Sequence, residues 1–213
     1  MQNSIQTQKL YKTVLILSVF TIVYNIIEGL LATFLGYRDG SLTLFGFGVD
    51  SFIEFISGLG IAHMIYRIKR NPNSNRDDFE KTALKITGGA FYILVTGLLV
   101  TSIYNLVSGQ KPGTTFWGVI ISLISIVVML VLIYGKLKVG KELKSEAILA
   151  DAECTRVCIY MSIVLLVSST IYELTKIPYI DAIGSLLLAW FSYREGRECF
   201  EKADSNKYGG CEH

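Results

Sequence analysis

Charge is scarce in this chain, and neither sign dominates. Of 213 residues, 20 are Lys or Arg and 18 are Asp or Glu, which leaves a formal net charge of +2. A nucleic-acid-binding protein needs a basic surface, and the near balance of charge gives no support for one. Soluble domains are more charged and less apolar than this chain, in which 51% of the residues are hydrophobic. The composition therefore indicates a membrane protein.

Cysteine is also scarce, and its positions exclude a disulfide framework. Cys154 and Cys158 lie inside an apolar run, whereas Cys199 and Cys211 lie near the C-terminus. This spacing is not that of a secreted disulfide-rich domain. A cleavable signal peptide is not expected either, because the first apolar run, Val14–Gly36, is too long for one and lacks a small-residue cleavage site.

What the chain has instead is long apolar runs. Crossing about 30 Å of hydrocarbon takes roughly 20 helical residues. Six runs qualify: Val14–Gly36, Leu42–Tyr66, Leu84–Val107, Thr115–Tyr134, Ala147–Tyr172 and Tyr179–Phe191 with a short extension to Tyr193. They are continuous and do not alternate as barrel strands do. We expect an all-α fold, a polytopic six-transmembrane-helix bundle over residues 1–203, followed by a short cytoplasmic tail at 204–213.

The basic residues divide unequally between the two sides of the membrane. One side holds Lys9, Lys12, Arg67, Lys69, Arg70, Arg76, Lys81, Lys85, Lys136, Lys138, Lys141, Lys144, Arg194, Arg197, Lys202 and Lys207. The other side holds only Arg38, Lys111 and Lys176. Because basic residues are retained in the cytoplasm, we expect both termini to be cytoplasmic. The expected location is the inner (plasma) membrane of a bacterium.

Two of the predicted spans carry polar pairs that are costly in a bilayer and are therefore functional candidates. The second span contains Asp50 and Glu54, and the fifth contains Cys154 and Cys158. Each pair is spaced i,i+4, so its two side chains project from one helix face. Two such pairs on facing helices supply four ligands, the number that a tetrahedral metal site needs. Counting residues from the membrane surfaces places Asp50 opposite Cys158, and Glu54 opposite Cys154.

Other interpretations of these four residues stay open at this point. Buried cysteines often serve only as small packing residues. One of the two carboxylates could form an ion pair with Arg156, which lies within the fifth span. A disulfide between Cys154 and Cys158 is a further alternative, although regular helix geometry does not favour it.

Three further groups are weaker candidates. Glu28 of the first span is a candidate proton acceptor or a partner of Arg156. Asp151 fits either a residue on the path of the cation or a solvated helix end, and the solvated end is the favoured interpretation. His63 is expected at the membrane interface. Four residues near the C-terminus have side chains that could bind a metal: Cys199, Cys211, Glu212 and His213. Their occurrence in a short tail is more simply explained by chance.

The chain resembles the membrane domain of the cation diffusion facilitator family over most of residues 10–203. The segment Gly40–Leu44, leading to Asp50, is similar to the start of the family's second helix. Ser145–Ala152 is similar to the approach to its fifth helix, and Tyr179–Ile183 to the start of its sixth. The resemblance implies six spans, cytoplasmic termini, a ligand pair on each of helices two and five, export of divalent cations and a homodimer.

The chain departs from the family's pattern at the ligands themselves. Glu54 occupies a position where the family usually has Asp, and Cys154 and Cys158 occupy those of its fifth-helix His and Asp. A His-rich cytoplasmic loop and a C-terminal metal-sensing domain are not expected. Thiolates favour Zn²⁺ or Cd²⁺ over Mg²⁺, Ca²⁺ or Mn²⁺. Because a free thiol is protonated at neutral pH, metal binding must displace a proton.

These inferences predict a transporter that exports Zn²⁺ or a similar cation in exchange for protons. The lipid bilayer, the cation and protons are its expected partners; the cation is a substrate, and no cofactor, enzymatic activity or nucleic-acid partner is expected. One rival is a membrane thiol redox protein that uses Cys154 and Cys158 as a couple. The other is a metal sensor that binds the ion without transporting it.

Overall fold

Six α-helices account for nearly all of the described chain. The computed structural model describes residues 2–71, 78–109, 111–177 and 179–205. The helices are α1 (Gln2–Asp39), α2 (Leu42–Arg70), α3 (Asp78–Ser108), α4 (Phe116–Leu143), α5 (Glu146–Thr175) and α6 (Tyr179–Asp204). No strand occurs among these residues. The predicted all-α, six-helix bundle is therefore confirmed.

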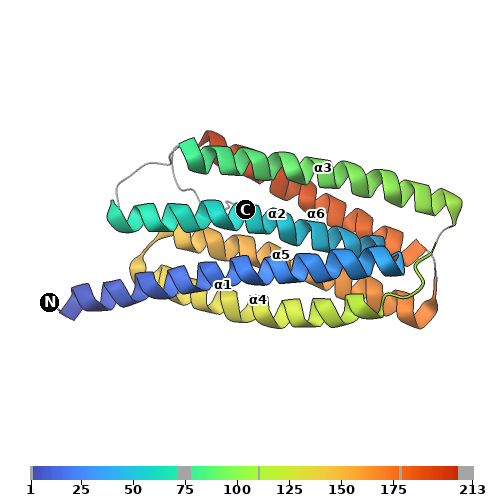
Figure 1. The fold of residues 1–213 in the computed structure, drawn as a ribbon, viewed down its shortest axis with the longest axis horizontal. Helices are drawn as coiled ribbons and strands as arrows, with labels where there is room; N and C mark the ends of the chain where they lie inside the picture. The colour runs from blue at the N-terminus through green and yellow to red at the C-terminus, as the bar shows by residue number, and fades with distance from the viewer. Residues whose placement is uncertain (1, 72–77, 110, 178, 206–213) are drawn as a thin grey trace.

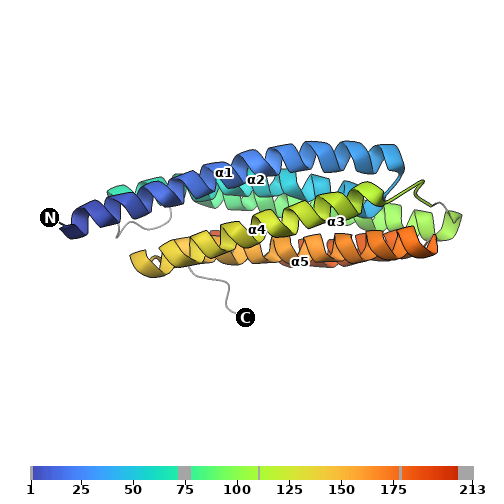
Figure 2. The same cartoon turned by 90° about the horizontal axis from the view of Figure 1, so that it is seen from below.

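The helices run antiparallel in chain order and form one elongated bundle (Figure 1). The connections after α1, α3 and α5 lie at one end, which we call the Gly40 end, and those after α2 and α4 lie at the other, the Lys144 end. The α1 helix begins and α6 ends at the Lys144 end. Helices α1, α2, α5 and α4 contact one another in a ring, and α3 packs along α6 beside α2 (Figures 1 and 2).

The outer faces of the helices are apolar, as expected for a bundle surrounded by lipid. Within the described residues, α1 to α5 are each long and apolar enough to cross a membrane. Large apolar side chains such as Ile93, Val131 and Leu174 point outward with more than half of their surface exposed. The α6 helix is mostly apolar from residue 179 to 193, where Asp181 is its one charged residue, and further charged residues follow from Arg194.

Glycines allow α1 and α2 to approach closely. A Cβ atom added at Gly36 would lie 2.4 Å from the backbone nitrogen of Phe45, and one at Gly48 would lie 2.4 Å from that of Thr33. The neighbouring backbones therefore occupy the space that a side chain would need.

Glycines farther along the chain differ in how closely they pack. Gly58 packs against Ile22 and Gly88 against Phe200, whereas a Cβ at Gly89 would have nothing within 4 Å.

At the Gly40 end, the start of α6 is tied to the start of α2. The Asp181 carboxylate accepts hydrogen bonds from Ser41 Oγ at 2.7 Å, from the backbone N–H of Leu42 at 2.6 Å and from that of Thr43 at 3.3 Å. The Thr43 hydroxyl donates to the carbonyl of Asp181. The first N–H groups of a helix have no partner within the helix and carry partial positive charge, so a carboxylate is a favourable cap. Asp181, which is only 2% exposed, thus fixes α6 against α2.

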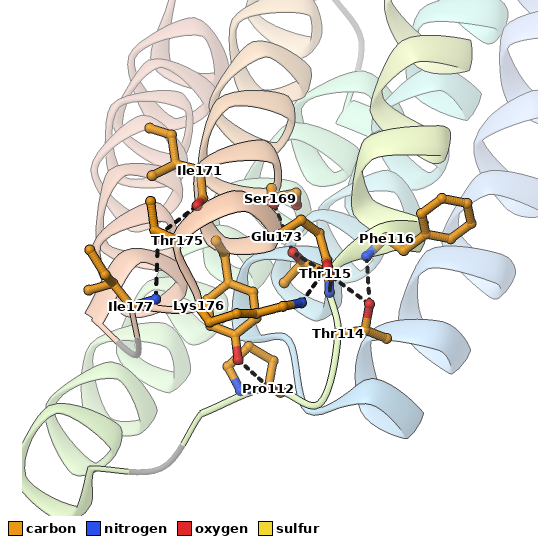
Figure 3. Close-up of polar contacts among 11 residues, drawn as sticks. Pro112, Thr114, Thr115, Phe116, Ser169, Ile171, Glu173, Thr175, Lys176 and Ile177 are labelled. Carbon is orange, nitrogen blue, oxygen red and sulfur yellow. Dashed lines mark hydrogen bonds and ion pairs between the residues drawn. The ribbon is translucent and has the colours of Figure 1, made fainter.

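A second carboxylate makes the matching contact for α4 (Figure 3). Glu173, in the last turn of α5, accepts hydrogen bonds from the hydroxyl of Thr114 and the backbone N–H of Thr115, immediately before α4, and pairs with Lys176. The Tyr172 hydroxyl donates to the carbonyl of Pro112 in the same connection. Two carboxylates therefore join the helices at the Gly40 end: Asp181 caps α2, and Glu173 holds the residues that precede α4.

Candidate metal centre

The centre of the bundle brings together one predicted ligand from α2 and one from α5. The Cys158 thiol donates a hydrogen bond to Glu54 Oε1 at 2.6 Å. Asn25 Nδ2 of α1 donates to the other oxygen, Glu54 Oε2, at 3.2 Å. A soft and a hard ligand atom thus meet between facing helices, and both Glu54 oxygens are held in place.

Asp50 lies one helical turn from Glu54, toward the Gly40 end. Its side chain is 2% exposed, and its Oδ1 atom has no hydrogen-bond partner within the described chain. The acidic groups that interact with it electrostatically are Glu54, Glu195 and Glu28. A buried carboxylate oxygen without a donor is costly unless a proton or a cation binds to it. The residue therefore fits a cation ligand.

Cys154 lies one turn from Cys158, toward the Lys144 end. Its sulfur is 4.0 Å from Nζ of Lys202 on α6. Cys154, Cys158 and Cys199 are free thiols, so the alternative of a Cys154–Cys158 disulfide is not seen. No three His, Cys, Asp or Glu side chains of the described residues converge closely enough to hold a metal ion. Of the four predicted ligands, Glu54 and Cys158 are joined by a hydrogen bond.

The predicted register between the pairs is wrong by one turn. Glu54 contacts Cys158, whereas counting along the helices paired Glu54 with Cys154. The count assumes that both helices stand upright and begin at the membrane surface. The α2 helix instead begins where Asp181 caps it. Packed helices also commonly cross at an angle. An error of about four residues in either start shifts the register by about 6 Å, which is one turn.

Glu28 is held by hydroxyl groups from three helices. Tyr24 donates to its Oε1 at 2.8 Å, and Ser51 of α2 lies 3.1 Å from its Oε2. Ser125 of α4 interacts with the same carboxyl group. Ser162 of α5 continues this polar chain, because its Oγ lies 3.0 Å from Ser125 Oγ and 2.8 Å from the carbonyl oxygen of Cys158. The chain extends from Glu28 to the backbone of a predicted ligand.

Asp151 is not the solvated helix end that the sequence favoured. It is 7% exposed, and its carboxylate pairs with Lys136 of α4, whose Nζ lies 3.0 Å from each oxygen. Lys136, which the sequence places with the basic residues at this end of the bundle, is buried as well, because its side chain is 2% exposed. The α4 helix continues to Leu143, well beyond the end of its apolar run, so Lys136 projects into the helix pair instead of into a connection.

The tail residues do not contribute to the observed site. Cys199 is buried within α6, at 7% exposure, whereas Cys211, Glu212 and His213 lie outside the described residues.

A family model described as the cation efflux transmembrane domain matches residues 14–203. The chain belongs to the cation efflux family. Membership confirms the resemblance inferred from the sequence. The family is one of membrane proteins that transport metal cations and is distinct from enzymes.

One relative is an uncharacterized transporter of Methanocaldococcus jannaschii. The two sequences are 27% identical over 175 residues, which are 80% of this chain and 62% of the relative. The chain therefore spans about three fifths of the length of this curated relative.

Two charged residues of this cation efflux domain escaped sequence reasoning. Glu195 of α6 is half-buried and interacts electrostatically with Asp50, Glu54 and Cys154. It follows the apolar run of α6, where the predicted span had already ended. Lys136 occupies the same kind of position after the fourth run. In both cases a charged residue within one or two turns of an apolar run was the available signal, and it is a weak one.

Proposed function

We propose that this protein exports Zn²⁺ or Cd²⁺ from the cytoplasm in exchange for protons. Asp50, Glu54, Cys154 and Cys158 are the proposed ligands, and the observation that carries the proposal is the contact between Glu54 and Cys158. A carboxylate and a thiol held together between two membrane-spanning helices form a mixed site, and its sulfur favours borderline and soft cations.

Proton exchange follows from the same contact. The hydrogen bond from Cys158 to Glu54 requires a proton between the two ligand atoms. A metal ion that binds both atoms must displace this proton, and a returning proton weakens the metal site. Metal binding and proton binding are thereby mutually exclusive at a single pair of groups, which is the condition for antiport.

Completion of the site requires a change of conformation. Asp50 lies one turn above the Glu54–Cys158 contact and Cys154 one turn below it, on different helices. Sliding or rocking α5 against α2 by about one turn, roughly 5 Å, would exchange the partners of Glu54. Such motion about a central site is how many transporters alternate access. Glu28, which interacts electrostatically with Asp50 and Glu54, is the proposed residue on the proton path between this site and solvent.

The proposed orientation puts the Lys144 end in the cytoplasm. The basic residues predicted on the cytoplasmic side lie mainly in connections and helix ends there, whereas the Gly40 end carries Arg38, Lys111 and Lys176. Both termini would then be cytoplasmic, in the inner membrane of a bacterium. A homodimer remains the proposed assembly, on the strength of family membership.

The proposal is tested by metal uptake into proteoliposomes that carry a pH gradient. Zn²⁺, Cd²⁺ and Mn²⁺ are compared for the wild type and the Cys154→Ala/Cys158→Ala double variant. Uptake of Zn²⁺ or Cd²⁺ that exceeds Mn²⁺ uptake, responds to the gradient and depends on the cysteines is the expected result. Full transport by the double variant, or tight binding without uptake, would refute it.

A further inference from the structure

Lys136 and Asp151 form a buried ion pair beside the proposed metal path. Nζ of Lys136 lies 3.0 Å from each carboxylate oxygen of Asp151 and 2.9 Å from Oγ1 of Thr155. An ammonium group has three hydrogens to donate, and these contacts use them all. The Thr155 hydroxyl in turn lies 3.1 Å from the carbonyl oxygen of Asp151. Both charges are therefore engaged with each other in this structure.

The pair stands between the Lys144 end and the Glu54–Cys158 contact. Asp151, Thr155 and Cys158 are spaced i, i+4 and i+7 along α5, so they share one helix face. Seven residues of helix place Asp151 about 10 Å from Cys158 along the axis. Lys136 also acts electrostatically on Glu54 itself. A cation that moves along this face of α5 must pass the pair.

The charge balance of the interior makes Lys136 distinctive. Of the lysines and arginines in the described residues, Lys136 is the one that is buried, whereas Glu28, Asp50, Asp151 and Asp181 are buried acids. Asp181 is already engaged by the start of α2. Lys136 is therefore the resident positive charge of an otherwise acidic interior.

From this geometry we infer that Lys136 is a tethered cation that competes with the transported metal for Asp151. The inference rests on the proposed function. A divalent ion and an ammonium group cannot both occupy the two Asp151 oxygens, because their charges repel each other. While no metal is present, Lys136 holds Asp151. A passing metal displaces Lys136 from Asp151. The ammonium group then returns and displaces the metal, so Asp151 does not retain the metal.

The competition is measured as the concentration dependence of Cd²⁺ uptake into proteoliposomes. Lys136→Met removes the charge and keeps the length of the side chain. It should lower KM for Cd²⁺ about tenfold and lower the maximal rate, because Asp151 then retains the metal. Lys136→Arg keeps the charge and should restore both values. Lys138→Met is the matched control, since Lys138 is exposed on the same helix, and it should leave both values unchanged.

The double variant Lys136→Met/Asp151→Asn separates competition from a purely structural role. Competition predicts that KM returns to within about threefold of wild type, because the carboxylate that traps the metal is gone. A structural role predicts that Lys136→Met lowers the yield of inserted protein and that the double variant restores it, with KM constant throughout. That second pattern overturns the inference.

A replacement variant and two further outcomes complete the test, and the two outcomes separate this inference from the proposed function. If Lys136→Met does not insert, Lys136→Gln replaces it, because a neutral amide can still donate to Asp151, and the same fall in KM is required. If the wild type transports Cd²⁺ but neither neutral variant changes KM, the tethered-cation inference fails and the transporter stands. If the wild type transports neither Cd²⁺ nor Zn²⁺, the proposed function fails, and this inference fails with it.

Discussion

The thiol of Cys158 donates a hydrogen bond across 2.6 Å to Oε1 of Glu54, and this contact joins α5 to α2 in the interior of the bundle. The two residues come from segments more than one hundred positions apart in the sequence. Each belongs to an i,i+4 pair. Asp50 lies one turn from the contact toward the Gly40 end, and Cys154 lies one turn from it toward the Lys144 end. The contact is therefore the point about which a four-ligand site could assemble, and several measurable consequences follow from its chemistry.

Replacing the sulfur by oxygen should change ion preference more than folding. Cys158→Ser keeps a hydrogen-bond donor of similar shape opposite Glu54 but removes the soft ligand. We expect Cd²⁺ and Zn²⁺ uptake to fall about tenfold or more, since even outer-shell changes at metal sites cost roughly that much. Mn²⁺ uptake should fall less, because Mn²⁺ prefers oxygen. Initial uptake rates for the three ions provide the measurement, and an equal loss for all three would contradict the role of sulfur.

Neutralising Glu54 should abolish uptake while preserving the fold. Glu54→Gln keeps the hydrogen bond with Asn25 within reach but removes the negative charge that a divalent ion needs. Glu201→Gln is the control, because Glu201 is exposed on α6 and pairs with the exposed Arg197. Cd²⁺ uptake and the elution profile of the purified protein are compared. Normal transport by Glu54→Gln would exclude this carboxylate as a ligand.

Removing the carboxylate of Asp181 should destabilise the bundle. Asp181→Ala leaves the Ser41 hydroxyl and the N–H groups of Leu42 and Thr43 without an acceptor in a buried place. Buried donors left unpaired cost about 1–3 kcal/mol each. We expect a clear fall in the midpoint of thermal unfolding in detergent. Asp204→Asn, at an exposed position on the same helix, should leave the midpoint unchanged; equal midpoints for both variants would contradict the capping role.

The α1–α2 contact should not tolerate a side chain at Gly48. A Cβ atom there would meet the backbone nitrogen of Thr33 at 2.4 Å, so Gly48→Ala must push the helices apart. Overpacking of this kind costs roughly 1–3 kcal/mol or more. Gly97→Ala on α3 is a matched control, because nothing lies within 4 Å of its Cβ position. The midpoints of thermal unfolding of the two variants are compared with that of the wild type. An unchanged midpoint for Gly48→Ala would contradict the close approach.

The parts of the fold and site that could be predicted from the sequence are those set by local periodicity. Apolar runs of membrane length fix the number of helices, and the i,i+4 spacing of Asp50 with Glu54 and of Cys154 with Cys158 fixes which face each pair shares. The helices that carry these pairs, α2 and α5, meet at Glu54 and Cys158.

What could not be predicted depends on how the helices slide and where they extend. The register between α2 and α5 is set by contacts such as that of Asp181 with the start of α2, which joins residues 139 positions apart. The burial of Lys136 depends on α4 continuing beyond its apolar run and on α5 presenting Asp151 at the same level. Neither relationship leaves a periodic signal in one sequence.

The most direct test of the account is the count of protons released when Cd²⁺ binds to purified protein in weakly buffered detergent solution. If the metal displaces the proton shared by Cys158 and Glu54, the wild type should release protons on binding, and Cys158→Ser should release about one fewer per bound ion. Cd²⁺ binding that releases no protons, or the same number from both proteins, would contradict the claim that this contact couples metal to protons.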